Sequence, residues 1–446
     1  MFYLCLCLFI VSMAAYRLTR RRIFCLAGVC SGLATSGCLL LLVKEESVSC
    51  RGPGQCRHLA SLSYQTLRKN EFSFKVNHPH IRSVDINYLP SNSPNEDRYS
   101  FGGLPESSAG LFAVIDGHRS FHCAEFLRQN LLKHVTQTLR EGGVVSGSLN
   151  IHRDGDTLLD AGGTESLQLP DNSDKVPSLL RKSFLDLDKN ISDGGLEAVE
   201  LVKKGHSIRS NEGIFAKLAQ ALSGACALFA MINPQTIYVA STGDCRAVLG
   251  KKAGSGWEPV ALSKDQNVHN EEEVNRVKSA HPGEEDTVIR ESRLLGGLMP
   301  FRAFGDTEYK WPEESLSHVH FVLGDYKTPP YLTAEPVVTS YPSTGGQFLI
   351  LGTDGLWERM KEQDIIDVVG RHYDKEGNKD KTSSKTFGLW SSKEKTCCEE
   401  SVNSATELLW ESLGGSDRSV KQLLEIPAGM SRMYRDDITI IVIHFK

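Results

Sequence analysis

Five short apolar runs, rich in β-branched residues, constrain the fold of this chain more than any other feature. Apolar runs of about four to eight residues are typical of strands buried in a sheet. They are Leu111–Ile115, Ala225–Ile232, Thr236–Ser241, Phe348–Leu351 and Ile438–Phe445. Between them, apolar residues at three- and four-residue spacing predict an amphipathic helix over about residues 121–140. The polar stretch that begins at Ser263 predicts a loop leading into a short helix.

Acidic residues stand at the ends of four of these runs. Asp116, Asp244 and Asp354 follow three of them, and the pair Asp436-Asp437 precedes the last. A carboxylate at the end of a buried strand is costly unless it is paired or bound to a cation. If the strands share one sheet system, these acids converge, and oxygen-only ligands select Mg²⁺ or Mn²⁺. Taken singly, each acid also fits ordinary Asp–Gly turn chemistry. Their joint occurrence favours a metal site, but the spacing alone does not identify a reaction.

Charge and cysteine content divide the chain. Residues 1–70 carry nine Lys and Arg against two Glu, whereas the whole chain has a net charge of -5. An acidic body argues against nucleic acid as a partner, because phosphate backbones need a basic face. Seven of the twelve cysteines precede residue 57, and no CxxC pair occurs. The body is therefore expected to be a reduced, intracellular domain without a zinc or disulfide framework.

Residues 1–70 are interpreted as an N-terminal targeting segment, and residues 71–446 as the catalytic domain. Two apolar stretches, Phe2–Tyr16 and Ile23–Val43, flank a group of four arginines. The second stretch is long enough to span a bilayer, which favours a membrane anchor. The arginines and the absence of acids before Glu45 favour mitochondrial targeting. A secretory signal is disfavoured because no positive charge precedes the first stretch. Targeting and anchoring both stay open.

Five segments, in order along residues 85–446, resemble the motifs of the protein phosphatase 2C family. They are Glu96-Asp97-Arg98, VIDGH (Val114–His118), STGDCRAVLG (Ser241–Gly250), TDGLWE (Thr353–Glu358) and RDDITIIV (Arg435–Val442). A closer resemblance is to the mitochondrial pyruvate dehydrogenase phosphatase catalytic subunits. It rests on LPSNSPNEDR (Leu89–Arg98), RLLGGLMPFRAFGD (Arg293–Asp306), TPPYLTAEP (Thr328–Pro336) and SRMYRDDITI (Ser431–Ile440).

The resemblance implies a fold and a reaction. The fold would be a four-layer α-β-β-α sandwich of two packed β-sheets flanked by helices. The reaction would be hydrolysis of phosphoserine or phosphothreonine on a protein, with two Mg²⁺ or Mn²⁺ ions per active site and no phosphoenzyme. The substrate would be the phosphorylated E1 component of the pyruvate dehydrogenase complex in the mitochondrial matrix. A regulatory subunit and contact of the N-terminus with the inner membrane are further implied partners.

The resemblance also assigns roles to individual residues. Asp116 would bridge both metals, with the carbonyl of Gly117 on one of them, and His118 would protonate the leaving alkoxide. The remaining ligands would be Asp354 and Asp436 directly, and Glu96 and Asp97 through water. Asp437 would not bind a metal directly but would support the residues that do. Asp244 and Glu358 fall where some members hold a third, weaker metal.

Two positions depart from the family pattern. Asn92 stands where many members have a phosphate-binding Arg, which the pyruvate dehydrogenase phosphatases also lack. Arg119 stands where the family prefers a small residue, and would either bind the substrate phosphate or crowd it. Arg302, Phe304 and Asp306 are interpreted as structural, and Gly224 and Gly243 as positions that backbone geometry reserves for glycine.

Two alternative functions stay open. One is a membrane-anchored phosphatase that acts on other proteins outside mitochondria. The other is a catalytically weakened family member that serves as a binding module. The latter is disfavoured because the expected inner ligands Asp116, Asp354 and Asp436 are all present.

Overall fold

The computed structural model describes most of the chain from Ser61 onward. The described residues are 61–76, 78–104, 108–147, 149–152, 173–317, 326–383, 402–427 and 429–446. The two N-terminal apolar stretches and the basic cluster between them lie outside these ranges. Within them, no helix combines the length and apolarity needed to cross a bilayer.

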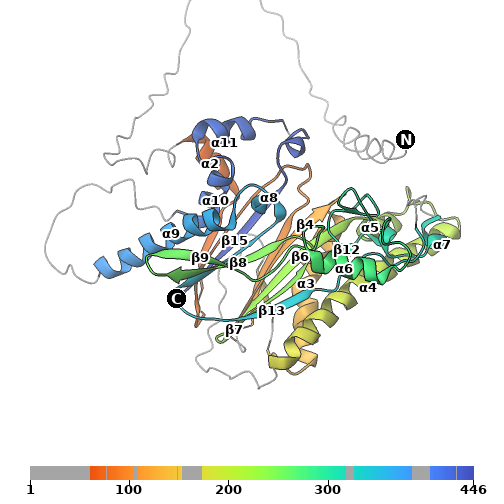
Figure 1. Ribbon diagram of the computed structural model, residues 1–446, viewed down its shortest axis with the longest axis horizontal. Helices are drawn as coiled ribbons and strands as arrows, with labels where there is room; N and C mark the ends of the chain where they lie inside the picture. The colour runs from red at the N-terminus through yellow and green to blue at the C-terminus, as the bar shows by residue number, and fades with distance from the viewer. Residues whose placement is uncertain are drawn as a thin grey trace, which may run out of the picture. The chain divides into compact units, whose positions relative to one another are not determined.

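Two antiparallel β-sheets form the centre of the domain (Figure 1). One has the order β1 (Phe72–Lys75), β2 (Ile81–Leu89), β15 (Ile438–Phe445), β14 (Gln347–Gly352), β8 (Arg246–Ala253) and β9 (Gly256–Ala261). The other has the order β13 (Val337–Pro342), β7 (Thr236–Thr242), β6 (Gly224–Ile232), β4 (Ala109–His118), β3 (Arg98–Leu104) and β5 (Asn150–His152), with β12 (Phe304–Gly305) also on β6. The five predicted strands are confirmed as β4, β6, β7, β14 and β15.

Helices cover the outer face of each sheet (Figure 1). The seven-stranded sheet packs against α3 (His122–Glu141), α4 (Val176–Lys203) and α5 (Glu212–Leu222). The six-stranded sheet packs against α2 (Leu62–Leu67), α9 (Glu362–Ser383), α10 (Ser404–Ser412) and α11 (Asp417–Leu424). The predicted helices near residues 121–140 and after Ser263 are confirmed as α3 and α6 (Glu271–Ala280).

Among the described residues, the apolar core of the sandwich lies in three layers that follow from this order, and a fourth cluster packs separately around Val277 and Tyr331. The layer between the sheets takes alternate residues of the facing strands, and all of its members are buried. They include Val84, Ile86, Phe112, Val114, Leu228, Leu351 and Ile441. Complete burial of one such side chain contributes about 1.5–3 kcal/mol, so this layer fixes how the two sheets sit on each other. The predicted four-layer α-β-β-α sandwich is confirmed.

Candidate active site

The strand ends that carry acids meet at one edge of the two sheets. Strand β4 ends in Asp116-Gly117-His118, and its pairing places Ile115 opposite Arg98 and therefore next to Asp97. Strand β14 ends at Gly352, which pairs with Ile440 near the start of β15. Asp354 opens the short helix α8 (Asp354–Trp357), two residues beyond that strand end. The predicted convergence of the acids therefore follows from strand register.

The acids are close enough to oppose one another's ionisation. Burial raises the pKa of Asp116 far above its usual range, and the charges of Asp354, Asp97, Asp244 and Asp436 raise it further. The pKa of Asp354 is also raised well above its usual range, first by burial and then by Asp244 and Asp436. A buried group of mutually repelling carboxylates is unfavourable unless a positive charge is held among them.

Two buried oxygen atoms show that this group fits divalent cations. Asp116 Oδ2 and Asp354 Oδ1 have no hydrogen-bond partner among the described residues. Native proteins rarely leave such atoms unsatisfied, so both oxygens are suited to a ligand outside the protein chain. Because every donor here is a carboxylate oxygen, the set suits Mg²⁺ or Mn²⁺ rather than a soft metal.

The loop before β3 carries Glu96 and Asp97 into this group. Asp97 is buried, and its Oδ2 accepts a hydrogen bond of 2.8 Å from Thr353 Oγ1, next to Asp354. Burial and then the charge of Asp437 raise the pKa of Glu96 to about 7. The two acids predicted to act through water therefore lie beside the acids predicted to bind metal directly.

Asp437 holds this loop in place. Its Oδ1 accepts hydrogen bonds from the backbone N–H groups of Ser91 and Asn92, the second at 2.8 Å. Its Oδ2 accepts from Glu96 N at 2.8 Å and from Asn92 Nδ2 at 3.1 Å. Both the backbone and the side chain of Asn92 therefore bind Asp437 within this loop. Asp437 affects the site by holding the backbone of Glu96. Its neighbour Asp436 is paired with Arg432 at 2.7 Å.

His118 is paired with an acid from a distant part of the chain. Its Nε2 lies 2.6 Å from Oδ2 of Asp306, which is fully buried. Burial disfavours the charged imidazole, but the charge of Asp306 and this hydrogen bond outweigh it and raise the pKa of His118. A Cβ atom at Gly224 would lie 2.1 Å from both His118 Nε2 and Asp306 Oδ2, so only glycine fits there.

The sequence interpretation grouped Asp306 with the structural residues and did not predict its pairing with His118. The other two members of its motif are structural as expected: Arg302 pairs with Glu273 at 2.5 Å, and Phe304 packs on Phe184 in the core. No sequence signal links Asp306 to His118, because β12 and the turn after it bring together segments 188 residues apart. Gly243 has φ of 100°, which confirms that backbone geometry reserves it for glycine.

Arg119 turns toward the same segment. Its guanidinium forms an ion pair with buried Glu308, lies 3.7 Å from Asp306 and sits over the ring of Tyr309. The backbone of Arg119 has a left-handed φ of 66°. The chain therefore leaves the extended direction of β4 at this residue. The structure therefore makes Arg119 the counter-ion of two buried acids rather than a cation presented to substrate.

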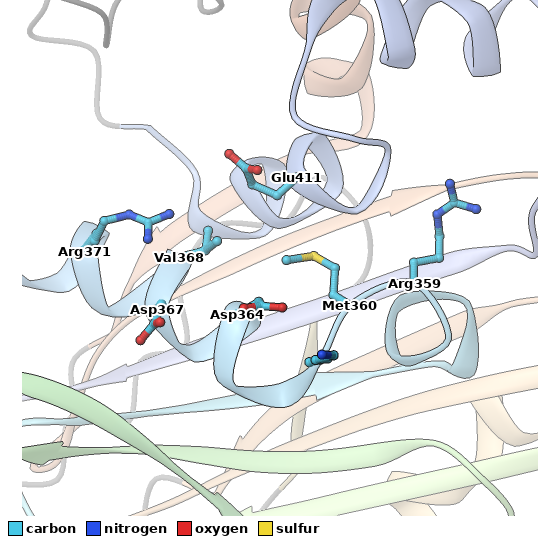
Figure 2. A pocket seen from close by; sticks show the side chains of 8 residues that line it. Arg359, Met360, Asp364, Asp367, Val368, Arg371 and Glu411 are labelled. Carbon is cyan, nitrogen blue, oxygen red and sulfur yellow. The ribbon is translucent and has the colours of Figure 1, made fainter.

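An open surface depression lies elsewhere, where α9, α10 and the turn after α8 meet (Figure 2). It is lined by Arg359, Met360, Lys361, Asp364, Asp367, Val368, Arg371 and Glu411. None of the clustered acids lines it, so it is separate from the candidate active site.

Comparison with known proteins gives consistent matches over most of the chain. A family model described as Protein phosphatase 2C matches residues 157–400. The human protein named [Pyruvate dehydrogenase [acetyl-transferring]]-phosphatase 1, mitochondrial, is 33% identical over 85% of this chain and 82% of its own length. Its human counterpart named phosphatase 2 is 31% identical over 82% of this chain and 78% of its own length. A protein phosphatase 2C homolog of Schizosaccharomyces pombe is 34% identical over 85% of this chain and 84% of its own.

Proposed function

The chain belongs to the protein phosphatase 2C family and is a metal-dependent protein-serine/threonine phosphatase, and we propose that its substrate is the phosphorylated E1 component of the pyruvate dehydrogenase complex. The observation that carries this proposal is the identity of 33% over 85% of the chain to a relative named for that activity. The relatives named for pyruvate dehydrogenase are also named mitochondrial, which supports a mitochondrial location for this chain.

In the proposed site, Asp116, Asp354, Asp436 and the carbonyl of Gly117 would hold two ions, Mg²⁺ or Mn²⁺. Glu96 and Asp97 would complete the ligand set through water. Two such cations supply an activated water molecule and neutralise charge on the phosphoryl oxygens. Strand register fixes the positions of the buried acids before substrate arrives. The groups that take part in the reaction are therefore already placed when substrate binds.

His118 serves as the general acid in this proposal. Its Nε2 donates to Asp306, which leaves Nδ1 as the nitrogen that delivers a proton to the departing serine or threonine oxygen. The raised pKa of His118 keeps the imidazole protonated nearer to neutral pH, where a general acid must hold its proton. Asp306 fixes the ring and stabilises its charged form.

The assignment is tested by phosphate release from phosphorylated E1 in the presence of Mg²⁺, Mn²⁺ or EDTA. We expect release with either ion, none with EDTA, and none from Asp116→Asn, which lacks the proposed bridging carboxylate. An unrelated phosphoprotein serves as the substrate control. Equal turnover of both proteins would contradict the proposed substrate, and full activity of Asp116→Asn in saturating Mn²⁺ would contradict the ligand assignment.

We also propose that residues 1–70 direct the protein to the mitochondrial matrix and contact the inner membrane, and that a regulatory subunit binds the domain. The basic, apolar composition of this segment supports the first part. Fractionation of cells that express a C-terminally tagged chain, followed by carbonate extraction of the mitochondria, tests it. Recovery of the tag outside mitochondria would exclude this location.

A further inference from the structure

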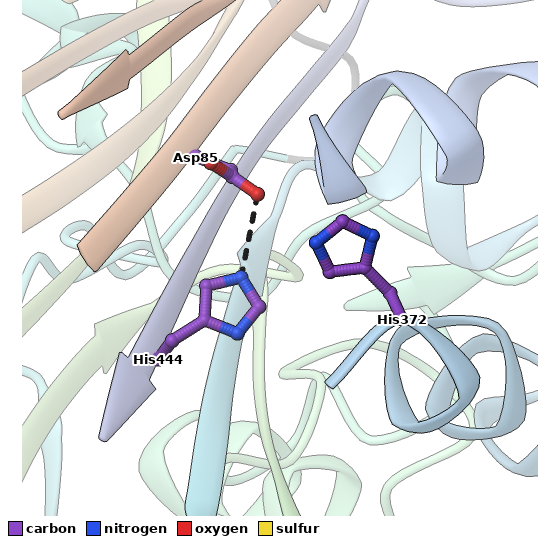
Figure 3. Close-up of side chains that lie close together, drawn as sticks. All are labelled: Asp85, His372 and His444. Carbon is purple, nitrogen blue, oxygen red and sulfur yellow. Dashed lines mark hydrogen bonds and ion pairs between the residues drawn. The ribbon is translucent and has the colours of Figure 1, made fainter. Parts of the chain in front are cut away.

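A second group of metal-ligating side chains lies where helix α9 packs on the six-stranded sheet (Figure 3). One ligand atom each from Asp85, His372 and His444 lie within 4.8 Å of one another. His444 is near the end of β15, whereas the proposed ligand Asp436 precedes the start of that strand. The two groups therefore occupy opposite ends of β15.

Strand pairing brings two of these residues together. Asp85 pairs with Val442, and His444 pairs with Ser83, so Asp85 and His444 are diagonal neighbours on one face of the sheet. His444 Nε2 lies 3.3 Å from Asp85 Oδ2. Ligands of a tetrahedral zinc ion, each about 2.0–2.1 Å from the metal, are about 3.3 Å apart. In the metal-free protein this contact is a hydrogen bond, and Ser404 Oγ lies 3.0 Å from the same nitrogen. A zinc ion between the two atoms would take the place of the shared proton at the same spacing.

The third residue comes from α9, whose position is fixed nearby. Tyr373 Oη donates a hydrogen bond of 3.0 Å to the carbonyl of Phe445, which ties α9 to β15. The adjacent His372 is half-buried, and its ring centre lies 5.8 Å from that of His444. In Figure 3 the His372 ring faces Asp85 and His444. One of its ring nitrogens lies within 4.8 Å of the ligand atoms of both Asp85 and His444.

A surrounding set of hydrogen bonds orients the carboxylate. Asp85 Oδ2 accepts from Ser404 N at 2.8 Å and from Ser404 Oγ at 2.6 Å, and Oδ1 accepts from Ser73 Oγ at 2.8 Å. Burial opposes ionisation of Asp85, but His444 and Ser404 outweigh it and lower its pKa well below the usual range. Asp85 is thus held as an oriented anion, as metal-binding carboxylates are.

We propose that Asp85, His372 and His444 form a zinc site that is distinct from the oxygen-only active site. Two imidazoles and one carboxylate are a ligand set typical of Zn²⁺, whereas Mg²⁺ and Mn²⁺ prefer oxygen ligands. Three protein ligands leave a fourth position for water. Bound zinc would fasten α9 to β2 and β15, since the ligands come from all three elements.

The test isolates this site from the acid cluster. The full chain carrying Asp354→Asn, which disables the proposed active-site pair, is stripped of metal and titrated with Zn²⁺ against a chelating indicator in excess Mg²⁺. Adding His372→Ala should remove one equivalent of bound zinc or weaken it at least about 100-fold, since it deletes a direct ligand. The matched control is His206→Ala, an exposed histidine outside the group.

Thermal unfolding gives a second measurement. Zn²⁺ should raise the unfolding temperature of the Asp354→Asn chain but not that of the chain that also carries His372→Gln, which keeps the side-chain volume. His372→Gln decides the matter if His372→Ala does not fold. Zinc binding by the His372 variants equal to that of the His206→Ala control would overturn the proposal. Displacement of the bound zinc by Mg²⁺ would overturn it as well.

Discussion

At the scale of single residues, the pairing of His118 with Asp306 makes a specific kinetic prediction. Asp306→Asn removes the charge that favours the protonated imidazole. Because general acid catalysis contributes about 10²–10⁴-fold, we expect kcat for a phosphoserine peptide to fall by at least about tenfold. Turnover of p-nitrophenyl phosphate should change little, because its leaving group needs no proton. Steady-state kinetics on both substrates measures the difference.

A matched control for this variant is Asp188→Asn. Asp188 supports the same segment through Gly305 N and Lys310 but does not contact His118. Asp188→Asn should change kcat for the phosphoserine peptide and for p-nitrophenyl phosphate by the same factor. Equal losses on both substrates in Asp306→Asn would show that Asp306 is only a structural support.

The raised pKa of Glu96 predicts how the stability of the metal-free protein changes with pH. Its folded-state pKa of about 7 lies above the ordinary value of 4.5, because burial and Asp437 disfavour its charge. The stabilising contribution of the protonated group is therefore fully present below pH 4.5 and is lost as pH rises through about 7. The cost at pH 8 is at most about 3 kcal/mol.

Urea unfolding in EDTA at pH 5 and pH 8 measures this effect. Glu96→Gln should reduce the loss of stability between the two pH values, because it removes one of the groups that must ionise. The remaining buried acids, including Asp116 and Asp354, should still leave a loss in the variant. An unchanged difference between pH 5 and pH 8 would contradict the raised pKa of Glu96.

At the scale of structural elements, the loop before β3 depends on one carboxylate. Asp437→Asn keeps the side-chain shape but removes the charge that accepts four hydrogen bonds. Hydrogen bonds to a charged group contribute about 1.5–3 kcal/mol each. We expect a higher Mg²⁺ concentration for half-maximal activity, because Glu96 is no longer held. Asn92→Ala removes one of the four bonds and should shift the Mg²⁺ requirement much less.

The contact between the end of β4 and the 306–309 segment depends on Arg119. Arg119→Ala leaves buried Glu308 without its counter-ion and leaves Asp306 with His118 as its remaining partner of this pair of cations, so we expect a lower unfolding temperature. The KM for a short phosphopeptide should stay within about twofold, since the guanidinium already faces these acids. A large rise in KM at unchanged stability would show instead that Arg119 binds the substrate phosphate.

At the scale of the whole molecule, the packed domain includes residues before Glu71. In α2, Tyr64 and Leu67 are buried against α10 and the sheet, and Tyr64 Oη donates to Glu407 at 2.6 Å. A chain that begins at Glu71 should therefore be less stable than one that begins at Ser61 by at least about 3 kcal/mol, the cost of emptying one such site.

Urea unfolding of the two shortened chains tests this prediction. A chain that begins at Ser61 and carries Leu62→Ala is the control, because Leu62 lies in the same helix but is 83% exposed. Equal stability of the Ser61 and Glu71 chains would show that α2 adds nothing to the fold. Both chains keep every proposed metal ligand. Phosphatase activity measured at low temperature, where both chains are folded, therefore separates a loss of stability from a loss of catalysis.

The sequence by itself determined the strands, the main helix and the clustering of acids. Periodicity and apolar runs are local, and they set β4, β14, β15 and α3 within a few residues. The acids at the strand ends predicted that Asp116, Asp354 and Asp436 converge, and the motif resemblance assigned them roles as metal ligands. These features depend on short-range pattern and on the two-residue period of a strand.

Only the tertiary structure decided which distant side chains face each other. The pairs His118–Asp306 and Arg119–Glu308, and the approach of His372 to His444, join elements that no spacing relates. The hydrogen bond from the backbone N–H of Asn92 to Asp437 is a further contact of this kind. Such contacts arise from how sheets and helices stack, and packing of that kind is set by the whole core rather than by any one segment.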